Sequence, residues 1–205
     1  MIPRWLSSTA LIVMIAPVLS GCVLFAAATV AGVQTVRQER TVGDAIDDRV
    51  IKTTLDGRLR QTSGLTFGIA TTVVEGRVLL AGRISKPEAR LDATRVAWTV
   101  DGVRKVENDL EVAETGGWLD RPQDFIMRQA LVVKLVGDKT IREQNYTTDV
   151  VHGIVYIMGV AEDQAEVDRV IAHANSLNNV KRVENYAVFK DDPIRRGFSV
   201  TSQNE

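Results

Sequence analysis

Apolar and polar positions along this chain follow two different periods, which predicts helices alternating with strands. Ile51, Leu55 and Leu59 recur every fourth residue after Asp44, a plausible N-cap region, and so fall on one face of a helix. Further along, β-rich runs flank Glu75-Gly76, and a glycine at such a corner permits the positive φ of a tight hairpin. We therefore predict a helix followed by a β-hairpin.

The residues after this hairpin predict a second helix and a closing strand. Ser85 is a good N-cap, and Pro87 is tolerated in the first turn of a helix. A narrow face of small apolar residues then follows, suited to packing on a sheet, and consists of Ala89, Ala93, Val96 and Val100. Asp101-Gly102 is expected to end the helix. The final strand is expected to carry Val103, Val106, Leu110 and Val112.

The same order of elements occurs twice. An offset of 77, which sets Val150 against Val73, pairs Val73, Val74, Gly76, Val78 and Gly82 with identical residues. An offset of 76 pairs Asp48, Leu55 and Leu59 with Asp124, Leu131 and Leu135. The second copy has apolar helix faces at Met127, Leu131 and Leu135 and at Val167, Val170, Ile171, Ala174 and Leu177. We predict two small α+β units, each ordered helix, hairpin, helix, strand.

The N-terminus has the order of a secretory signal. Arg4 precedes a run from Trp5 to Val33 that contains no charged residue. Leu19-Ser20-Gly21-Cys22 resembles the lipobox of bacterial lipoproteins. That resemblance implies removal of residues 1–21, a diacylglyceryl group on the Cys22 thiol and a further fatty acid such as palmitate on its amine. Residues 22–43 would then form a lipid-anchored segment.

Two alternatives concern this anchor. The first alternative concerns which membrane holds the anchor. In enteric bacteria an aspartate directly after the cysteine favours retention in the inner membrane, and this chain has Val23 there. We therefore expect sorting to the outer membrane, with anchoring in the inner membrane as the alternative. The uncharged run also exceeds the roughly 20 residues that span a bilayer, so an uncleaved transmembrane helix is the other interpretation. Both place the rest of the chain outside the cytoplasm, at a membrane.

Composition argues against catalysis and against nucleic-acid binding. The formal net charge of -1 gives no global attraction to nucleic acid, and the one cysteine excludes an intramolecular disulfide. His152 and His173 are expected to be solvent-exposed, and Asp47-Asp48 is interpreted as complementing a helix dipole rather than holding a metal. Because no phosphate loop or hydrolase motif occurs, we predict no enzyme, no cofactor and no metal site.

The duplicated unit, with its apolar–Gly–apolar hairpin, following helix and closing V–x–x–V strand, resembles the BON domain. This resemblance implies αββαβ units, each with a three-stranded mixed sheet packed against two helices. Together with the lipobox it indicates the dual-BON-domain bacterial lipoprotein family, and Arg40 to Asp48 resembles the family's entry into its first domain. The expected boundaries are 44–113 and 121–190 for the domains, 114–120 for a linker and 191–205 for a flexible tail. The domains are expected to pack against each other.

The resemblance also implies that the first helix of the second domain binds anionic phospholipid through an exposed aromatic residue and nearby basic residues. The matching segment here is Pro122 to Arg128. The candidate lipid-binding residues are Trp118, Arg121, Phe125, Ile126, Arg128 and Lys134. Ile126 stands where the family has its aromatic, with Phe125 one place earlier. The alternative is that Phe125 and Trp118 fill the interface between the two domains.

The sequence thus predicts a periplasm-facing outer-membrane lipoprotein that binds anionic phospholipid and supports outer-membrane integrity. The alternative is an envelope protein adaptor without lipid headgroup recognition, which would bind through Trp98, Trp118 or exposed sheet edges. Trp98 is interpreted as an interdomain or partner contact. No nucleic-acid partner is expected, and the oligomeric state stays open.

Overall fold

The computed structural model describes residues 41–62, 65, 68–113 and 122–195. Residues 38–205 form one compact unit, which contains every element described below. The predicted signal and Cys22 lie outside the described residues, as do the predicted linker with Trp118, and Arg121. Within the described ranges, no helix is both long and apolar enough to cross a membrane.

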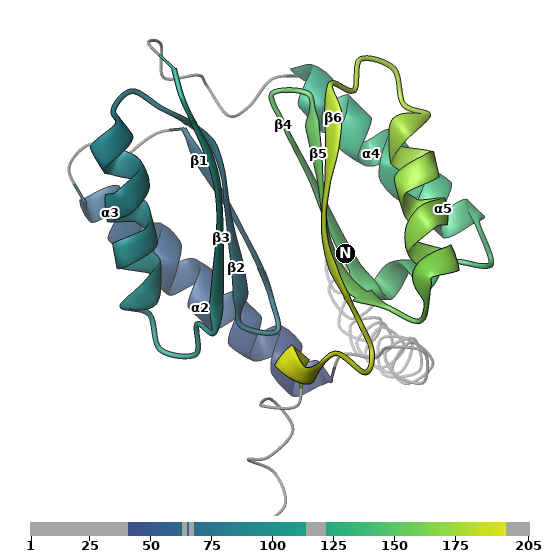
Figure 1. Ribbon diagram of the computed structural model, residues 1–205, viewed down its shortest axis with the longest axis horizontal. Helices are drawn as coiled ribbons and strands as arrows, with labels where there is room; N and C mark the ends of the chain where they lie inside the picture. Colours follow the sequence, from purple (N-terminus) through teal and green to yellow (C-terminus); the bar gives the residue numbers. More distant parts are fainter. Residues whose placement is uncertain (1–40, 63–64, 66–67, 114–121, 196–205) are drawn as a thin grey trace, which may run out of the picture. The chain divides into compact units, whose positions relative to one another are not determined.

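The first domain has the predicted order of elements (Figure 1): α2 (Val42–Gln61), β1 (Ile69–Val74), β2 (Arg77–Ile84), α3 (Pro87–Trp98) and β3 (Lys105–Val112). β1 runs antiparallel to β2, and β2 runs parallel to β3. Glu75 and Gly76 form the β1–β2 turn with φ values of 52° and 70°, so the predicted tight hairpin is confirmed. The core gathers apolar residues of α2, α3 and the sheet.

The second domain repeats this topology with α4 (Pro122–Gly137), β4 (Tyr146–Val151), β5 (Ile154–Ala161), α5 (Gln164–Asn175) and β6 (Arg182–Phe189). A 3-10 turn, η2 (Glu143–Asn145), precedes β4. β4 is antiparallel to β5, which is parallel to β6, and His152-Gly153 forms the hairpin turn. Two α+β units with three-stranded mixed sheets are therefore confirmed.

The helix ends differ from the sequence predictions. α2 begins after Thr41 rather than at Asp44. Thr41 Oγ1 accepts a hydrogen bond from the Asp44 N–H at 3.1 Å, and the Asp44 carboxylate accepts a hydrogen bond from the Thr41 N–H at 2.9 Å. This reciprocal capping box satisfies two N–H groups at once, which explains the shift. Lys86, not Ser85, is the N-cap of α3, and its side chain makes no capping bond. Pro87 fixes the first turn instead.

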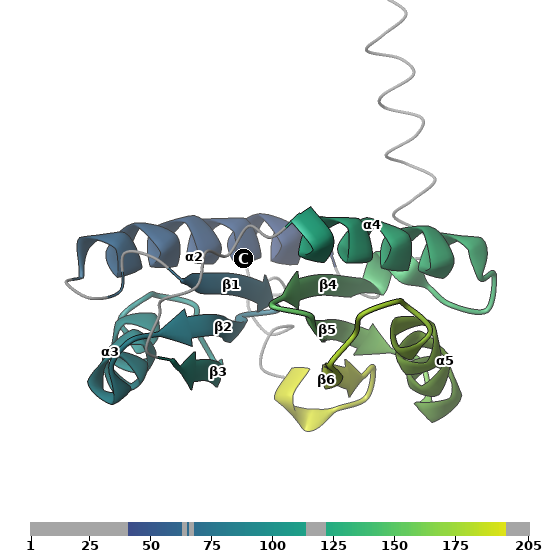
Figure 2. The same cartoon turned by 90° about the horizontal axis from the view of Figure 1, so that it is seen from above.

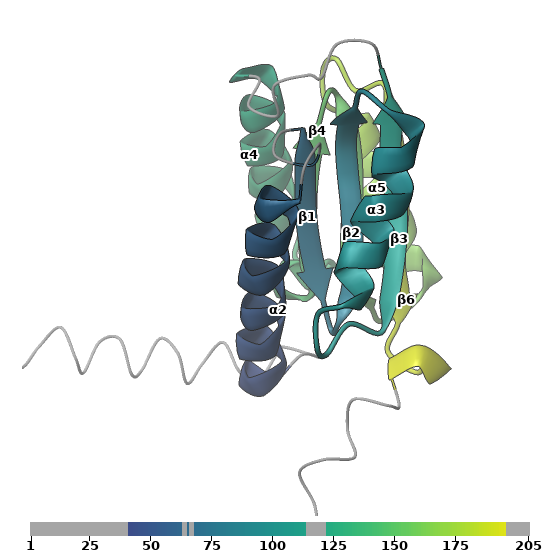
Figure 3. The same cartoon turned by 90° about the vertical axis from the view of Figure 1, so that its left-hand side faces the viewer.

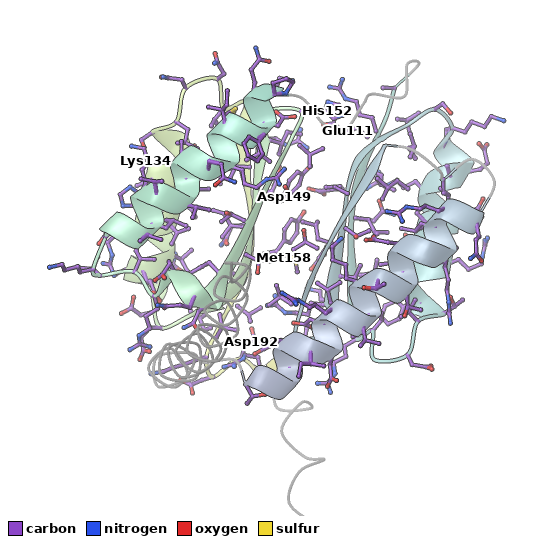
Figure 4. All side chains as sticks on the ribbon, turned by 180° about the vertical axis from the view of Figure 1, so that it is seen from behind. Glu111, Lys134, Asp149, His152, Met158 and Asp192 are labelled. Carbon is purple, nitrogen blue, oxygen red and sulfur yellow. The ribbon has the colours of Figure 1, made fainter. Side chains whose placement is uncertain are left out.

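The sheet faces opposite the helices pack against each other. Val74, Leu79 and Ala81 of the first domain form one buried cluster with Val151, Ile154, Tyr156 and Met158 of the second. Met158 lies between the two sheets (Figure 4). We call this cluster the seam. It confirms that the two domains pack together, and none of its residues comes from α2 or α4.

Candidate functional site

The inner side of α4 is anchored to its own domain. Met127, Leu131 and Leu135 are buried in the core as predicted. Asp124 is also buried, and its carboxylate accepts hydrogen bonds from the N–H groups of His152 at 2.8 Å and Gly153 at 2.9 Å. The inward face therefore fixes the rotation of α4 about its own axis.

The outer side of α4 is apolar. Five of its side chains are between 41 and 71% exposed: Phe125, Ile126, Val132, Val133 and Val136. We call these five residues the apolar face of α4. Asp124 is the only acidic residue of the helix and points inward, so no carboxylate interrupts this face. An exposed apolar face of this kind is typical of a surface that meets a partner or a membrane.

Two cations flank the apolar face of α4. Arg128 lies with its Nε 3.0 Å from Asp149 Oδ1, so much of its charge is already compensated. Burial raises the pKa of the Asp149 carboxyl, while the charge of Arg128 opposes that rise. Lys134 is exposed and makes no ion pair within the part of the chain that the structure describes. Lys134 is thus the better placed of the two to meet an external anion, and Figure 4 looks onto this side of the molecule.

The structure places four predicted site residues, namely Phe125, Ile126, Arg128 and Lys134, on this one helix. Phe125 is 58% exposed and is not part of the seam, so the seam alternative does not hold for it. The three valines of the apolar face were not among the predicted site residues. Their signal was present, because Phe125, Val132, Val133 and Val136 recur at spacings that share a helix face away from Leu131.

Both histidines differ from expectation. His152 is buried in the hairpin turn, where its N–H binds Asp124, so the predicted exposure is wrong. His173 is partly buried, and its Nε2 lies 2.9 Å from Asp138 Oδ2. Hydrogen bonds from Thr140 and His173 hold the pKa of Asp138 well below its usual range. Neither imidazole is placed as a free surface ligand.

Asp48, the second residue of the acidic pair in α2, has a structural role. The Asp48 carboxylate is buried and accepts from the N–H groups of Glu75 at 2.8 Å and Gly76 at 2.9 Å, as Asp124 does in the second domain. It therefore ties α2 to the hairpin, which the helix-dipole interpretation did not foresee. Among the described residues, no group of three His, Cys, Asp or Glu side chains is placed to hold a metal ion.

Polar contacts cross the seam at its edges. The Arg77 guanidinium donates to the carbonyl oxygens of Tyr186 at 2.7 Å and Gly159 at 2.9 Å, and Arg182 lies 3.0 Å from Glu111. Residues 191–195, predicted as the start of a flexible tail, instead enter a 3-10 turn, η3 (Pro193–Arg195). Arg195 then binds the Glu75 carboxylate at 2.9 Å. These contacts hold the domains in one arrangement within unit 38–205.

A second exposed stripe lies on α3. Leu91, Arg95 and Trp98 follow one another at spacings of four and three residues, and both apolar side chains are more than half exposed. Trp98 is not part of the seam, so its interdomain interpretation is not supported. α3 packs over β2 and β3, on the same face of the sheet as α2, which packs over β1 (Figure 2).

Three curated proteins resemble this chain. An uncharacterized protein from the gshII 5′ region of Anaplasma centrale is 34% identical over 152 residues, covering 74% of this chain and all of that protein. Osmotically-inducible protein Y of Escherichia coli is 25% identical and covers 76% of this chain and 79% of its own length. Outer membrane lipoprotein DolP of Haemophilus influenzae is 26% identical and covers 80% of this chain and 86% of its own length.

Among solved structures, the chain is similar to CdsD, a structural protein of the type III secretion system of Chlamydia trachomatis. The match has 14% sequence identity and a TM-score of 0.29, and it covers 69% of this chain and 63% of that one. So distant a match carries no argument about function. The family comparison is more specific, since the BON domain model matches residues 47–114 and 123–191, which are the two copies described above. The chain therefore belongs to the BON-domain family, and it carries the domain twice.

Proposed function

We propose that this chain is an outer-membrane-anchored, periplasm-facing lipoprotein that binds anionic phospholipid through α4 of its second BON domain and supports outer-membrane integrity. Its two BON domains and its similarity to Outer membrane lipoprotein DolP support this role. The lipobox-like residues before Cys22 support an acyl anchor, with 1–21 as signal peptide and 22–43 as anchored segment.

The apolar face of α4 is the observation that carries the proposal. A Phe side chain has an area of about 200 Å², so the 58% of Phe125 that is exposed corresponds to roughly 100 Å². At about 25 cal/mol per Å², moving that area into the acyl boundary of a bilayer contributes about 2.5 kcal/mol. Ile126 and Val133, which are still more exposed, add to this contribution. A helix lying in the interface with its apolar face inserted needs no pocket.

The flanking cations supply lipid selectivity. A Lys or Arg near an anionic surface contributes about 1 kcal/mol. Lys134 can make this contribution in full, whereas Arg128 shares its charge with Asp149. We expect the preference for anionic over zwitterionic lipid to depend on Lys134 more than on Arg128.

The acyl anchor and α4 act together in this proposal. Each buried CH₂ of a fatty chain contributes about 0.8 kcal/mol, so the anchored cysteine holds the protein at the bilayer. The anchor raises the effective concentration of α4 at the lipid surface, and a weak second contact then suffices. Growing cells with an alkyne-bearing fatty acid tests the anchor, because the parent chain should be labelled and Cys22→Ala should not.

Vesicle binding tests the α4 contact. The unit from residue 38 to 205 should co-sediment with phosphatidylglycerol vesicles and not with phosphatidylcholine vesicles. Phe125→Glu and Lys134→Glu should weaken this binding, and Leu91→Glu, which places the same charge on an equally exposed apolar site of α3, should leave it unchanged. Equal binding by Phe125→Glu and the parent would refute the contact. Arg128→Glu is a poor test because it would also set a second carboxylate beside Asp149.

The α3 stripe favours a second candidate, an envelope protein adaptor. Leu91, Arg95 and Trp98 combine an exposed aromatic with a cation, a composition typical of protein interfaces. If the parent ignored both kinds of vesicle and captured an envelope protein that Trp98→Ala did not capture, the adaptor function would replace the lipid function.

A further inference from the structure

The first helices of the two domains occupy equivalent places. Asp48 in α2 and Asp124 in α4 bind the hairpin turns of their own domains with the same pair of distances. Both helices run along the edge strands β1 and β4 of the two sheets, whereas α3 and α5 pack nearer to β3 and β6 (Figures 2 and 3). Whatever flat surface approaches α4 from outside therefore also approaches α2.

The outward side of α2 carries its own apolar residues. Ile46 and Val50, one turn apart, are 58% and 61% exposed. The offset of 76 that aligns Asp48 with Asp124 also sets Val50 against Ile126, which is 64% exposed. Neither Ile46 nor Val50 belongs to the seam or to the core of its domain. The Ile126 position of the apolar face of α4 is thus apolar and exposed in α2 as well, whereas the Phe125 position is taken by Arg49.

One cation beside Val50 is placed to meet an anionic surface. Arg49 precedes it, is exposed, and its guanidinium makes no ion pair within the described residues. The nearby Asp44 carboxylate accepts hydrogen bonds from the neutral N–H and hydroxyl of Thr41 and keeps its negative charge. Asp47 is exposed and opposes an anionic surface, so α2 should contribute less than α4, whose outward face has no acid.

The position of α2 in the chain brings it close to the anchor. Cys22 precedes Thr41 by 19 residues, and a chain of that length spans at most about 65 Å. α2 is therefore the first described helix after the acylated residue. Its N-terminal half, which contains Ile46 and Val50, is the part of the first domain with the shortest tether to the bilayer.

We propose that Ile46, Arg49 and Val50 of α2 form a second membrane contact, so that both BON domains rest on the same anionic bilayer. This inference rests on the proposed function of α4 and adds the first domain to it. Two helices on one plane fix the orientation of the domain pair, since a single helix would leave it free to rock. α3 and α5 then stay on the side away from the lipid.

An environment-sensitive fluorophore on a single introduced thiol tests this inference. The full chain has one natural cysteine, Cys22, whose thiol is blocked if it is acylated. Val50→Cys reports on α2, Ile126→Cys reports on the equivalent place of α4, and Ala172→Cys on α5 is the control. The parent chain, treated with the same reagent, measures any reaction at Cys22.

Each result has a distinct meaning in phosphatidylglycerol proteoliposomes. We expect blue-shifted emission at Val50→Cys and Ile126→Cys, no shift at Ala172→Cys, and roughly tenfold weaker vesicle binding by Val50→Glu in the unanchored chain. A shift at Ile126→Cys without one at Val50→Cys overturns this inference and leaves the proposed function standing. No shift at Ile126→Cys overturns the proposed function itself. A protein partner over α2 would give a shift at Val50→Cys that persists without lipid, which also overturns the inference.

Discussion

Replacing Asp124 by alanine should destabilise the second domain more than any surface change on α4. The carboxylate oxygens accept hydrogen bonds from two buried backbone N–H groups of the β4–β5 turn, with N···O distances of 2.8 and 2.9 Å. A hydrogen bond to a charged group contributes about 1.5–3 kcal/mol, and the alanine variant leaves two buried donors unpaired. The expected loss is therefore about 3–5 kcal/mol, a large share of the 5–15 kcal/mol that is typical of a folded domain.

Urea unfolding followed by circular dichroism measures this loss by linear extrapolation. Asp124→Asn keeps one acceptor oxygen and should lose about 2 kcal/mol. Asp48→Ala should match Asp124→Ala, because Asp48 makes the same two bonds in the first domain. Asp47→Asn is the exposed control and should change the free energy of unfolding by no more than about 0.5 kcal/mol.

A helix-dipole role alone predicts a different result. A carboxylate in the first turn of a helix contributes only about 0.3–1 kcal/mol through the dipole. If Asp124→Ala cost less than about 1 kcal/mol, the hydrogen bonds from the turn to Asp124 would not be a main source of the stability of the domain. The same small loss at Asp48→Ala would refute the structural equivalence of the two helices.

Three further predictions concern the core and the seam. Burial raises the pKa of the Glu111 carboxyl, but the hydrogen bond and the charge of Arg182 outweigh that effect and leave the pKa below 4.5. The ionised Glu111 therefore stabilises the fold above pH 4.5. This stabilisation is lost as the pH falls through the lowered pKa. Acid unfolding should accordingly show a shallower loss of stability for Glu111→Gln than for the parent, and identical pH profiles would contradict this. Gly82→Ala should cost at least about 2 kcal/mol in thermal unfolding, because φ is 131° and a Cβ would overlap the Gly68 carbonyl oxygen. Leu131→Ala should cost about 3 kcal/mol in urea by opening a cavity, yet leave vesicle binding of the folded protein unchanged.

The sequence predicts the two domains well because their requirements are local. Glu75-Gly76 and His152-Gly153 lie at the hairpin turns, where both residues of each pair need positive φ. The four-residue spacing of Leu55 and Leu59 selects the buried side of α2. Such signals depend only on neighbours in the chain, so periodicity and turn chemistry suffice to find them.

Contacts between distant segments were not predictable in the same way. β5 is buried at every position, which is typical of a strand covered on both faces, but the sequence does not say what covers the second face. His152 looked exposed because hairpin tips usually are. Its burial depends on how the turn packs against other segments, and so does the pairing of Arg128 with Asp149.

The candidate site was only partly visible in the sequence. The family resemblance pointed to Phe125 and Ile126, and the structure confirms that both are exposed. The valines of the apolar face and the matching Val50 of α2 were overlooked because apolar residues are usually assigned to the core. Exposure depends on which side of the helix Asp124 and Leu131 fix inward, and that requires the packed structure.

A vesicle titration of Phe125→Glu/Ile126→Glu tests the central claim most directly. The unit from residue 38 to 205 and this variant would be titrated with phosphatidylglycerol vesicles, with circular dichroism confirming that the variant is folded. Loss of the apolar contribution of Phe125 alone, about 2.5 kcal/mol, predicts binding weaker by roughly fifty- to a hundredfold. Equal affinity of the folded variant and the parent would contradict α4 as the lipid contact.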